Sequence, residues 1–495
     1  MLRRYGRWLA VLPPLAFLPF ILSPPLNHDV AGVFSFAQRW LAGERLYIDI
    51  IDVNPPLIFI LNLAPAWFAR ATGLDPVRAL QGFILAFGLL AGWLALRVRG
   101  PVEGCTGAYI AALPALFLLG PGYDFGQREA LMAVAALPYL LASARRMAGE
   151  RVRHPIAIGL LAGIGFALKP HFLAIPALVE VFVARHQRDA RDPLRWAMLA
   201  VGGAYAIAVL LVFPAYLAEI VPMALETYVD LGGGFVGLLA QPRLVTILVL
   251  LHLAAVRGWR AGREAQVFVL AAAGAAVSAL IQHKGWSYHL IPIELFTFAL
   301  IGLLVAHRLD DRARLLPAAH AAILTGAVCV YLVGVGETPW NQLRYRTSVD
   351  LPLRAALDRI AADSPTGDAR ALVLSRTLAP IYPALLYANV TATAPMLDVW
   401  PLGGAYRACE PGRERYHAPA EMGRAERFYH RQVTTGMRRA PPDAVLIDRY
   451  PRIPDCPQPF DLLEYFRRNP DFAIAFAGYR QAGSVGQFDI YLRAR

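Results

Sequence analysis

HDVAGVFSFAQRWLAGERLYIDIIDVNPPL, residues 28–57, follows directly after the first long apolar run of the chain. It places Asp29 a few residues beyond that run and then predicts an amphipathic helix, before the stretch closes with Pro55-Pro56 and Leu57. A carboxylate so near the end of a membrane span is poorly placed for packing but well placed for chemistry at the boundary between lipid and water. The stretch therefore separates a membrane-embedded part of the chain from an interfacial part.

Apolar runs of about 20 residues recur along the first two-thirds of the chain. Hydrophobic residues make up 57% of the 495 residues and charged residues 17%. This composition excludes a soluble globule and predicts a polytopic α-helical membrane protein with about 11 transmembrane helices. The expected spans cover residues 8–26, 77–96, 105–121, 130–144, 155–168, 172–184, 196–216, 244–256, 265–281, 290–306 and 315–335.

Arginine occurs mainly in alternate loops, and the loops between them carry acidic residues. Short loops rich in Lys and Arg stay in the cytoplasm, so the alternation predicts a cytoplasmic N-terminus and a C-terminus outside the cytoplasmic (inner) membrane. The basic loops are residues 3–7, 97–99, 145–153, 185–195, 257–263 and 308–314, and the outward loops contain Asp29, Asp49, Asp52, Asp124, Glu219, Glu226 and Asp230.

Two apolar runs leave alternatives open. Residues 57–68 must lie on the outer surface for this orientation to hold, because a further crossing there would invert every later loop. Residues 8–26 have the basic start of a signal peptide, but no A-x-A site follows them, so we expect an uncleaved anchor.

The composition changes near residue 336, where the apolar spans end. Short apolar runs at residues 371–375, 444–448 and 488–492 predict strands, and residues 351–362 and 461–468 predict helices. We therefore expect a membrane domain over residues 1–335, with its first outward loop at about 27–76, and a soluble, extracytoplasmic α/β domain over residues 336–495. An outside location permits a disulfide between Cys409 and Cys456, although two separate thiols are an equal alternative.

The net charge of +12 is spread over many loops. It forms no single basic stripe with interleaved aromatic residues, which argues against nucleic-acid binding. Contacts between arginines and anionic membrane lipids account for much of it.

The first outward loop offers a candidate catalytic base. Val30, Phe34, Ala37 and Leu41 follow a helical period and are expected to lie on lipid, while Gln38, Arg39 and Glu44 face water. Asp29 would then accept a proton from a hydroxyl group as it attacks an activated carbon. The alternative is that Asp29 only caps the helix.

Further charged residues stand beside other spans on the same predicted side. Asp124, Arg128 and Glu129 precede one span, where a charge is costly unless it is paired or functional. Arg128 can form a structural ion pair with either carboxylate, or Asp124 can converge with Asp29 on one acceptor or metal ion.

Lysines and histidines interrupt two other apolar stretches, ALKPHFLAIP and IQHKGWSYHLIPI. Lysines at an interface can extend harmlessly to water. Together with Arg128, however, the set suits a phosphate-bearing ligand, for which Lys supplies a point charge and Arg a fork. The lysines and histidines of these two stretches are Lys169, His171, His283, Lys284 and His289.

The order of these landmarks resembles that of the membrane glycosyltransferases of the C structural class (GT-C), particularly the branch with the lipid A aminoarabinose transferases and the protein O-mannosyltransferases. The resemblance covers residues 8–306. It rests on His28-Asp29, Gly43-Glu44-Arg45-Leu46-Tyr47, Asn54-Pro55-Pro56, Tyr123-Asp124, Leu168-Lys169-Pro170 and His283-Lys284-Gly285.

The resemblance implies a polyprenyl-phosphate sugar as donor, a lipid, glycan or protein as acceptor, and inversion at the anomeric carbon with Asp29 as base. Asp124 would orient the acceptor or the partner of Asp29. The donor phosphate would lie near Lys169, Lys284 and Arg128, and His28, Tyr47 and His289 are candidates for sugar contacts.

The chain departs from the family pattern at two positions. Many relatives have Asp-Glu in the first loop, whereas Val30 follows Asp29 here. The sequence therefore assigns no ligands to a divalent metal, although it does not exclude one. The aminoarabinose transferases have Lys before the proline where Asn54 stands, so Lys169 or Lys284 would replace that contact to the donor phosphate.

Two other classes of function stay open. A transporter or lipid flippase would use the same charges as a pathway, but it predicts related halves or paired broken helices, which the sequence does not contain. A non-enzymatic envelope assembly protein would leave Asp29 and Asp124 without a role.

Overall fold

The computed structural model describes residues 6–99, 103–187, 189, 191–229, 231–232, 234–312, 317–335, 341, 351–365, 367–407, 415–453 and 459–494. Cys409, Cys456 and Asp230 lie outside these residues, so the disulfide and its alternative, two separate thiols, both stay predictions. The chain forms two compact units. Unit 1 comprises Met1–Pro25, Gln81–Ala208 and Gly232–Gln342; unit 2 comprises Leu26–Leu80, Val209–Leu231 and Leu343–Arg495.

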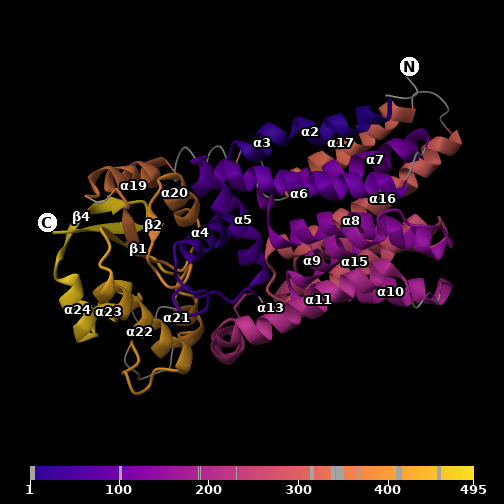
Figure 1. Ribbon diagram of the computed structural model, residues 1–495. Helices are drawn as coiled ribbons and strands as arrows, with labels where there is room; N and C mark the ends of the chain where they lie inside the picture. Colours follow the sequence, from indigo (N-terminus) through magenta and orange to yellow (C-terminus); the bar gives the residue numbers. More distant parts are fainter. Residues whose placement is uncertain are drawn as a thin grey trace. The chain divides into compact units, whose positions relative to one another are not determined.

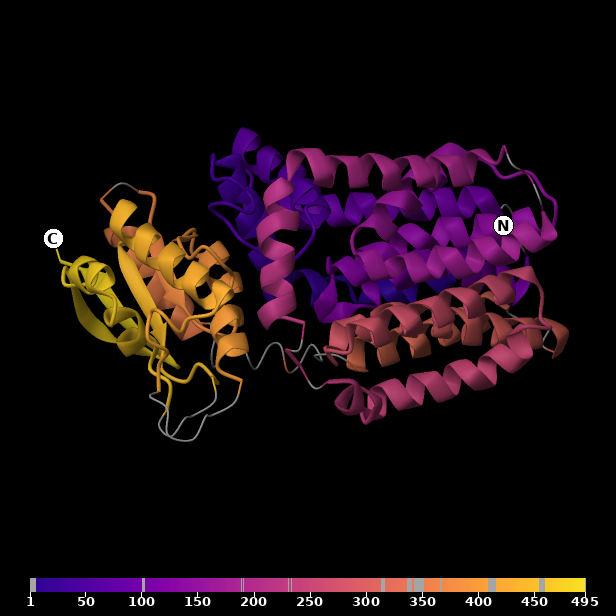
Figure 2. The same cartoon turned by 90° about the horizontal axis from the view of Figure 1, so that it is seen from below.

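Unit 1 is a bundle of long helices (Figures 1 and 2). Each of the eleven expected spans coincides with a helix or, at the N-terminus, with three short helical segments. The elements that lie wholly or mainly in unit 1 are η1 (Gly6–Val11), α2 (Leu12–Ala16), α3 (Leu18–Leu22), α6 (Pro76–Arg99), α7 (Gly104–Leu119), α8 (Arg128–Met147), α9 (Pro155–Ala167), η3 (Pro170–Leu173), α10 (Ala174–His186), α11 (Pro193–Val212), α13 (Gly234–Leu239), α14 (Pro242–Gly258), α15 (Arg263–Gln282), η5 (Ser287–Leu290), α16 (Ile291–Arg312) and α17 (Pro317–Val335).

Five helical segments among the described residues are long and apolar enough to cross a membrane. They are Pro76–Arg99, Pro193–Val212, Arg263–Gln282, Ser287–Asp311 and Pro317–Gly334. Trp8–Leu22, Leu57–Thr72, Gly104–Leu119 and Pro155–Ala167 are apolar but shorter. The protein is therefore a helical membrane protein, while the number of crossings stays a prediction.

Small residues bring the helices of unit 1 close together. Gly159 and Gly163, four residues apart on α9, face α11, and a Cβ at Gly163 would lie 2.8 Å from Cβ of Val201. Gly274 on α15 is equally close to α10, since a Cβ there would lie 2.6 Å from Cα of Ile175. Membrane helices pack through such small residues because lipid supplies little hydrophobic drive between them.

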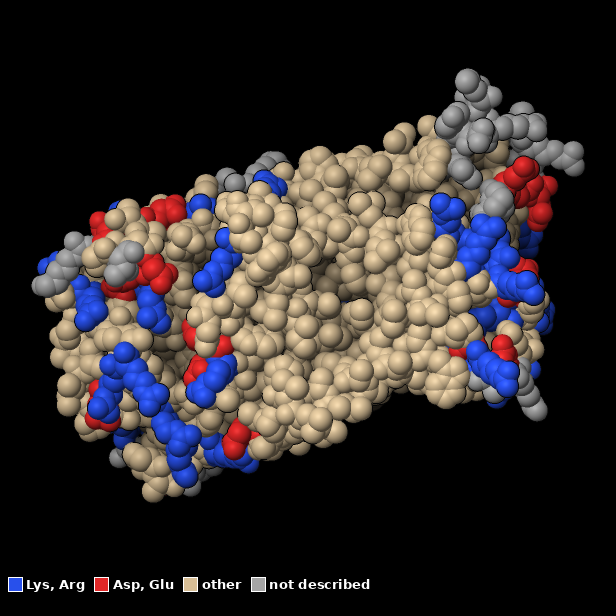
Figure 3. Space-filling view, in the orientation of Figure 1, with Lys and Arg blue, Asp and Glu red and all other residues tan. Residues whose placement is uncertain are grey.

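Several basic loops expected on the cytoplasmic side meet at one end of unit 1. Arg99 Nε lies 3.3 Å from Glu264 Oε1, and Arg145 donates to the Arg99 carbonyl at 3.4 Å. Arg263 Nη1 lies 2.9 Å from His186 Nε2. Figure 3 shows Lys and Arg at this end and a broad uncharged surface over the helices beside it.

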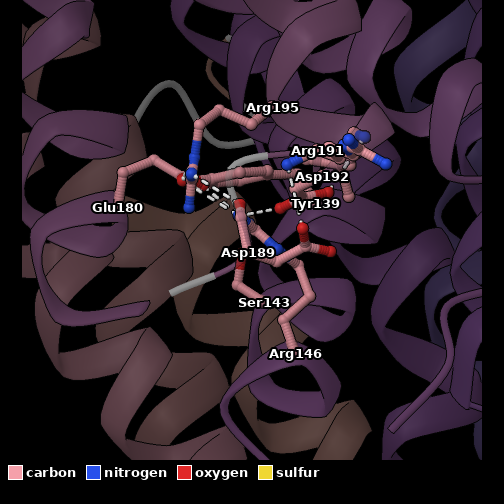
Figure 4. Close-up of polar contacts among 9 residues, drawn as sticks. Tyr139, Ser143, Arg146, Glu180, Asp189, Arg191, Asp192 and Arg195 are labelled. Atoms are coloured by element: carbon pink, nitrogen blue, oxygen red, sulfur yellow. Dashed lines mark hydrogen bonds and ion pairs between the residues drawn. The ribbon is translucent and has the colours of Figure 1, made fainter. Parts of the chain in front are cut away.

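An ion network around Arg146 ties α8, α10 and α11 together at the same end (Figure 4). Arg146 on α8, which is 4% exposed, donates to Glu180 of α10 at 2.6 and 3.0 Å and also pairs with Asp192. Arg195 of α11 and Tyr139 of α8 donate to the same Glu180 carboxylate at 2.9 and 3.0 Å. Each charge is thus compensated, as burial requires.

Unit 2 joins the first loop to the C-terminal third of the chain. Its helical elements are α4 (His28–Leu41), α5 (Leu57–Thr72), η4 (Tyr216–Ile220), α12 (Val221–Thr227), α19 (Leu351–Asp363), α20 (Ile381–Tyr387), α21 (Trp400–Ala405), α22 (Arg424–Arg439), α23 (Leu462–Arg467) and α24 (Pro470–Phe476). Its strands are β1 (Arg370–Leu374), β2 (Thr391–Ala392), β3 (Ala444–Asp448), β4 (Tyr479–Val485) and β5 (Phe488–Arg493). The three predicted strands and two predicted helices of this region are confirmed within one or two residues.

The five strands form a mixed sheet in the order β2-β1-β3-β5-β4. β1 pairs in parallel with β2 and β3, and β5 runs antiparallel to β3 and β4. β3 is buried along its whole length, whereas the middle of the edge strand β4 is exposed. Continuous apolar strands are buried on both faces, which explains the short apolar runs that predicted β1 and β3.

Helix α4 is buried more deeply than its sequence predicted. Val30, Phe34 and Ala37, which were expected to lie on lipid, are buried inside unit 2, where α4 packs against α5 and α20. Arg39, expected in water, is 4% exposed; it pairs with Glu44 at 2.6 Å and donates to the Ala394 carbonyl at 2.6 Å. Both expectations are wrong because a segment more than 340 residues away covers the helix.

Candidate active site

Asp29 lies in the first turn of α4 but does not cap the helix. The side-chain oxygen of Asn27 accepts hydrogen bonds from the backbone N–H groups of Asp29 at 2.9 Å and Val30 at 3.4 Å. The Asp29 carboxylate is 19% exposed and lies 3.9 Å from His28 Nε2. The capping interpretation of Asp29 is therefore wrong, because Asn27 performs that role.

The turn after α4 is shaped by two residues with positive φ, Gly43 at 110° and Tyr47 at 67°. The buried Tyr47 donates its hydroxyl to the Asn54 carbonyl at 2.6 Å. Asn54 in turn donates its side-chain amide to Asp52 at 2.6 Å. Tyr47 and Asn54 thus hold the loop together, and their expected substrate contacts stay predictions.

The C-terminal part of unit 2 adds a carboxylate to this region that sequence analysis missed. The backbone N–H of Ile51 donates to the Pro395 carbonyl at 2.7 Å, which fixes the segment before Asp398 against the first loop. Asp398 accepts a hydrogen bond from the backbone N–H of Trp400 at 2.6 Å. No motif marks Asp398, because only tertiary contacts bring it near the first loop.

Asp398 has a strongly perturbed acidity. The pKa of its carboxyl is raised from 3.8 to about 7: burial is the main cause, the carboxylates of Asp52 and Asp29 contribute, and the Trp400 N–H and Arg376 oppose the rise. Burial also lowers the pKa of the Arg376 guanidinium. The first loop and the C-terminal part of the chain therefore bring three carboxylates within electrostatic range of one another.

The acids and bases of unit 1 form a second cluster at the ends of α8, α9 and α15. Lys169 Nζ lies 2.5 Å from Glu129 Oε1, and it also donates to Gln282 at 3.4 Å. His289 Nε2 is 3.9 Å from the same Glu129 oxygen. Glu129, Lys169 and His289 are all buried. The partner of Glu129 is thus a lysine 40 residues away along the chain.

The remaining basic residues of the expected phosphate site lie on the same elements. Arg128, adjacent to Glu129, is 5% exposed. His171 is half-buried in η3, and Lys284 is half-buried with its Nζ 4.9 Å from the Trp286 ring centroid. These residues cluster with Lys169, whereas their contact with a donor phosphate stays a prediction.

Asp124 lines a small cavity together with a second ion pair that sequence analysis missed. Arg243 donates to both carboxylate oxygens of Glu294 at 2.6 Å, and Asp124, Arg243 and Glu294 all line this cavity. Neither Arg243 nor Glu294 was singled out from the sequence. Asp124 belongs to unit 1 and Asp29 to unit 2, so their convergence stays a prediction.

The described residues contain no group of three or more His, Cys, Asp and Glu side chains arranged to hold a metal ion. The Asp29, Asp52 and Asp398 carboxylates interact electrostatically. They do not form such a set, and no metal ligands are assigned.

Two solved structures of one protein resemble this chain over almost its whole length. The crystal structure of ArnT from Cupriavidus metallidurans bound to undecaprenyl phosphate has a TM-score of 0.56 and 14% sequence identity, covering 98% of this chain and 97% of that chain. Its apo state has the same TM-score and identity, with 96% of each chain covered. The expected GT-C fold is thereby confirmed.

Another similar structure gives weaker information. The archaeal oligosaccharyltransferase AglB from Archaeoglobus fulgidus, in complex with an inhibitory peptide and a dolichol-phosphate, has a TM-score of 0.46 and 12% identity, covering 100% of this chain and 75% of that chain. A TM-score of this size does not establish a common fold. No protein-family model matches the sequence, and a search of curated protein sequences gives no match.

Proposed function

We propose that the protein is an integral membrane glycosyltransferase that moves a sugar from a polyprenyl-phosphate donor to a lipid, glycan or protein acceptor on the outer side of the cytoplasmic membrane. The observation that carries the proposal is the position of Asp29: it is partly exposed in the first turn of α4, and Asn27 caps that helix. The full-length likeness to ArnT bound to undecaprenyl phosphate supports the choice of donor.

In the proposed reaction Asp29 is the general base. It removes the proton from the acceptor hydroxyl as the hydroxyl oxygen attacks the anomeric carbon of the sugar. The bond between that carbon and the donor phosphate breaks, its electron pair passes to the phosphate oxygen, and the configuration inverts because attack and departure occur on opposite faces. Asp124 would orient the acceptor or the partner of Asp29.

Fixed cations would stabilise the leaving phosphate. Lys169, Lys284 and Arg128 supply positive charge on neighbouring elements, and charge that develops on the phosphate oxygen is stabilised best by such preorganised groups. Contacts to the sugar are assigned to His28, Tyr47 and His289. Asn54, His171 and Glu129 are further residues proposed to bind substrate.

The proposed orientation places the N-terminus in the cytoplasm and residues 336–495 outside it. Support comes from the ion pairs and hydrogen bonds that join several arginine-rich loops at one end of unit 1. The lysines and acids of the candidate site lie on the loops predicted to be outside.

Purified protein incubated with radiolabelled polyprenyl-phosphate sugars and membrane extract tests the proposal. We expect Asp29→Asn to lower transfer by about 10²- to 10⁴-fold, the usual contribution of a general base. Asp49→Asn, in the same loop but paired with Arg45 at 2.9 Å, is the matched control and should transfer sugar like the wild type. Equal transfer by Asp29→Asn and wild type would remove Asp29 from the mechanism. Transbilayer movement of the intact donor without cleavage would indicate a flippase instead.

A further inference from the structure

Glu129 places a negative charge in a site that is proposed to bind an anion. It is 0% exposed and its Oε1 lies 2.5 Å from Lys169 Nζ, the cation proposed for the donor phosphate. The ammonium of Lys169 therefore already has a carboxylate partner, with which a phosphate must compete.

Several buried polar atoms at and around this ion pair lack hydrogen bonds. Glu129 Oε2, His289 Nδ1 and His171 Nε2 are buried atoms that have no hydrogen-bond partner among the residues the structure describes. Removing a carboxylate from water is costly unless its remaining lone pairs are satisfied. Replacement of such a pair by a better-bonded arrangement is correspondingly easy.

Partly exposed side chains lie beside the buried Glu129–Lys169 pair. Gln282, Tyr288 and Lys284 are each partly exposed, and Lys169 Nζ lies 3.4 Å from the Gln282 side-chain oxygen and 5.4 Å from the centroid of the Tyr288 ring. The buried pair thus lies beside partly exposed side chains at the C-terminal end of α15 and in η5.

The reaction itself changes the charge that this site must hold. The sugar donor is a phosphodiester with one negative charge. After the sugar leaves, the polyprenyl phosphate is a monoester with a charge of about −1.5 to −2 at pH 7. Fixed cations alone would therefore hold the product more tightly than the donor and delay its release.

We propose that Glu129 is a competing anion that Lys169 exchanges for the donor phosphate, and that returns to Lys169 to expel the polyprenyl monophosphate product. This inference rests on the proposed function of the site. Glu129 is here a positioning residue, because it acts on the phosphate through Lys169. Its negative charge opposes the doubly charged product more than the singly charged donor.

Binding of two probes, farnesyl phosphate and its methyl diester, tests this role without any sugar transfer. In wild type we expect dissociation constants that differ by less than about threefold, because Glu129 offsets the extra charge of the monoester. Glu129→Gln should tighten monoester binding by about tenfold and diester binding by less. The effect should vanish when Lys169→Met is combined with Glu129→Gln, since the carboxylate acts through that lysine.

Glu264→Gln is the matched control, because it removes one negative charge at the opposite end of unit 1, where Glu264 pairs with Arg99. It should leave both dissociation constants unchanged. Unchanged or weaker monoester binding by folded Glu129→Gln would overturn the inference. If that variant does not fold, a wild-type preference of tenfold or more for the monoester overturns it equally.

The two proposals fail in different ways. Wild type that binds neither probe contradicts the proposed phosphate site and with it the proposed function. Wild type that binds both probes, with no effect of Glu129→Gln, contradicts only the role of Glu129.

Discussion

Asp398 makes the stability of unit 2 depend on pH in a direction opposite to that of most carboxylates. Burial raises the pKa of Asp398 from 3.8 to about 7, so the folded protein keeps a proton there that the unfolded chain has already lost. Between these two pH values the folded state binds more protons than the unfolded state, and stability therefore falls as the pH rises. Asp398→Asn removes this dependence, since an amide does not titrate.

The size of the effect follows from the shift. Each pH unit between 3.8 and 7 costs about 1.4 kcal/mol of stability. At pH 5.5 the wild type has lost stability over less than two of these pH units. At pH 8.5, which is above both pKa values, it has lost the full amount. The stabilisation of Asp398→Asn over wild type should therefore be larger at pH 8.5 than at pH 5.5 by about 2 kcal/mol.

Thermal unfolding of the full-length protein in detergent measures this difference. If unit 2 unfolds as one body, about 2 kcal/mol raises the Tm difference between variant and wild type by roughly 4–8 °C from pH 5.5 to pH 8.5. Asp471→Asn is the control, because Asp471 is an exposed carboxylate paired with Arg438 in the same unit. A Tm difference that is the same at both pH values, or larger at pH 5.5, would refute the reasoning.

Two further predictions concern single contacts. Asn27→Ala removes the cap of α4 and should lower stability by about 1 kcal/mol and reduce sugar transfer, whereas Asn27→Ser keeps a capping oxygen and should retain both; equal behaviour of the two variants would contradict the capping role. Arg146→Met removes the cation that pairs with Asp192 and one of the two arginines that pair with Glu180, and should destabilise the protein by about 3–5 kcal/mol, measured by thermal unfolding. The neighbouring Arg145→Met, whose partner Glu150 is exposed, should cost at most about 1 kcal/mol, and a similar loss in both variants would argue against the network.

Local patterns in the sequence predicted the elements of this protein well. Apolar runs marked the long helices of the bundle but not the short helix α13, and β1, β3 and β5 were visible as short apolar segments, because burial along one element imposes a local periodicity. The alternation of arginines likewise anticipated that Arg99, Arg145 and Arg263 lie at one end of unit 1.

Partners that are distant in the sequence could not be predicted in this way. Arg39 looked like a water-facing residue of an interfacial helix, yet it is buried by a contact to a residue 355 positions away. Arg128 was an evident partner for Glu129, but the structure pairs Glu129 with Lys169. No periodic signal marked Asp398 as a neighbour of the first-loop acids.

The amino-acid sequence by itself determined that this chain forms apolar helices and a small α/β region, and that charged residues stand at the helix ends. Tertiary structure alone decided which of those charges meet, which are compensated, and that Asn27 rather than Asp29 caps α4. The physical reason is that these features depend on interactions between residues at different separations in the sequence. Helix and strand formation depend on neighbours within a few residues, whereas the energy of a buried charge depends on whichever segment is folded against it.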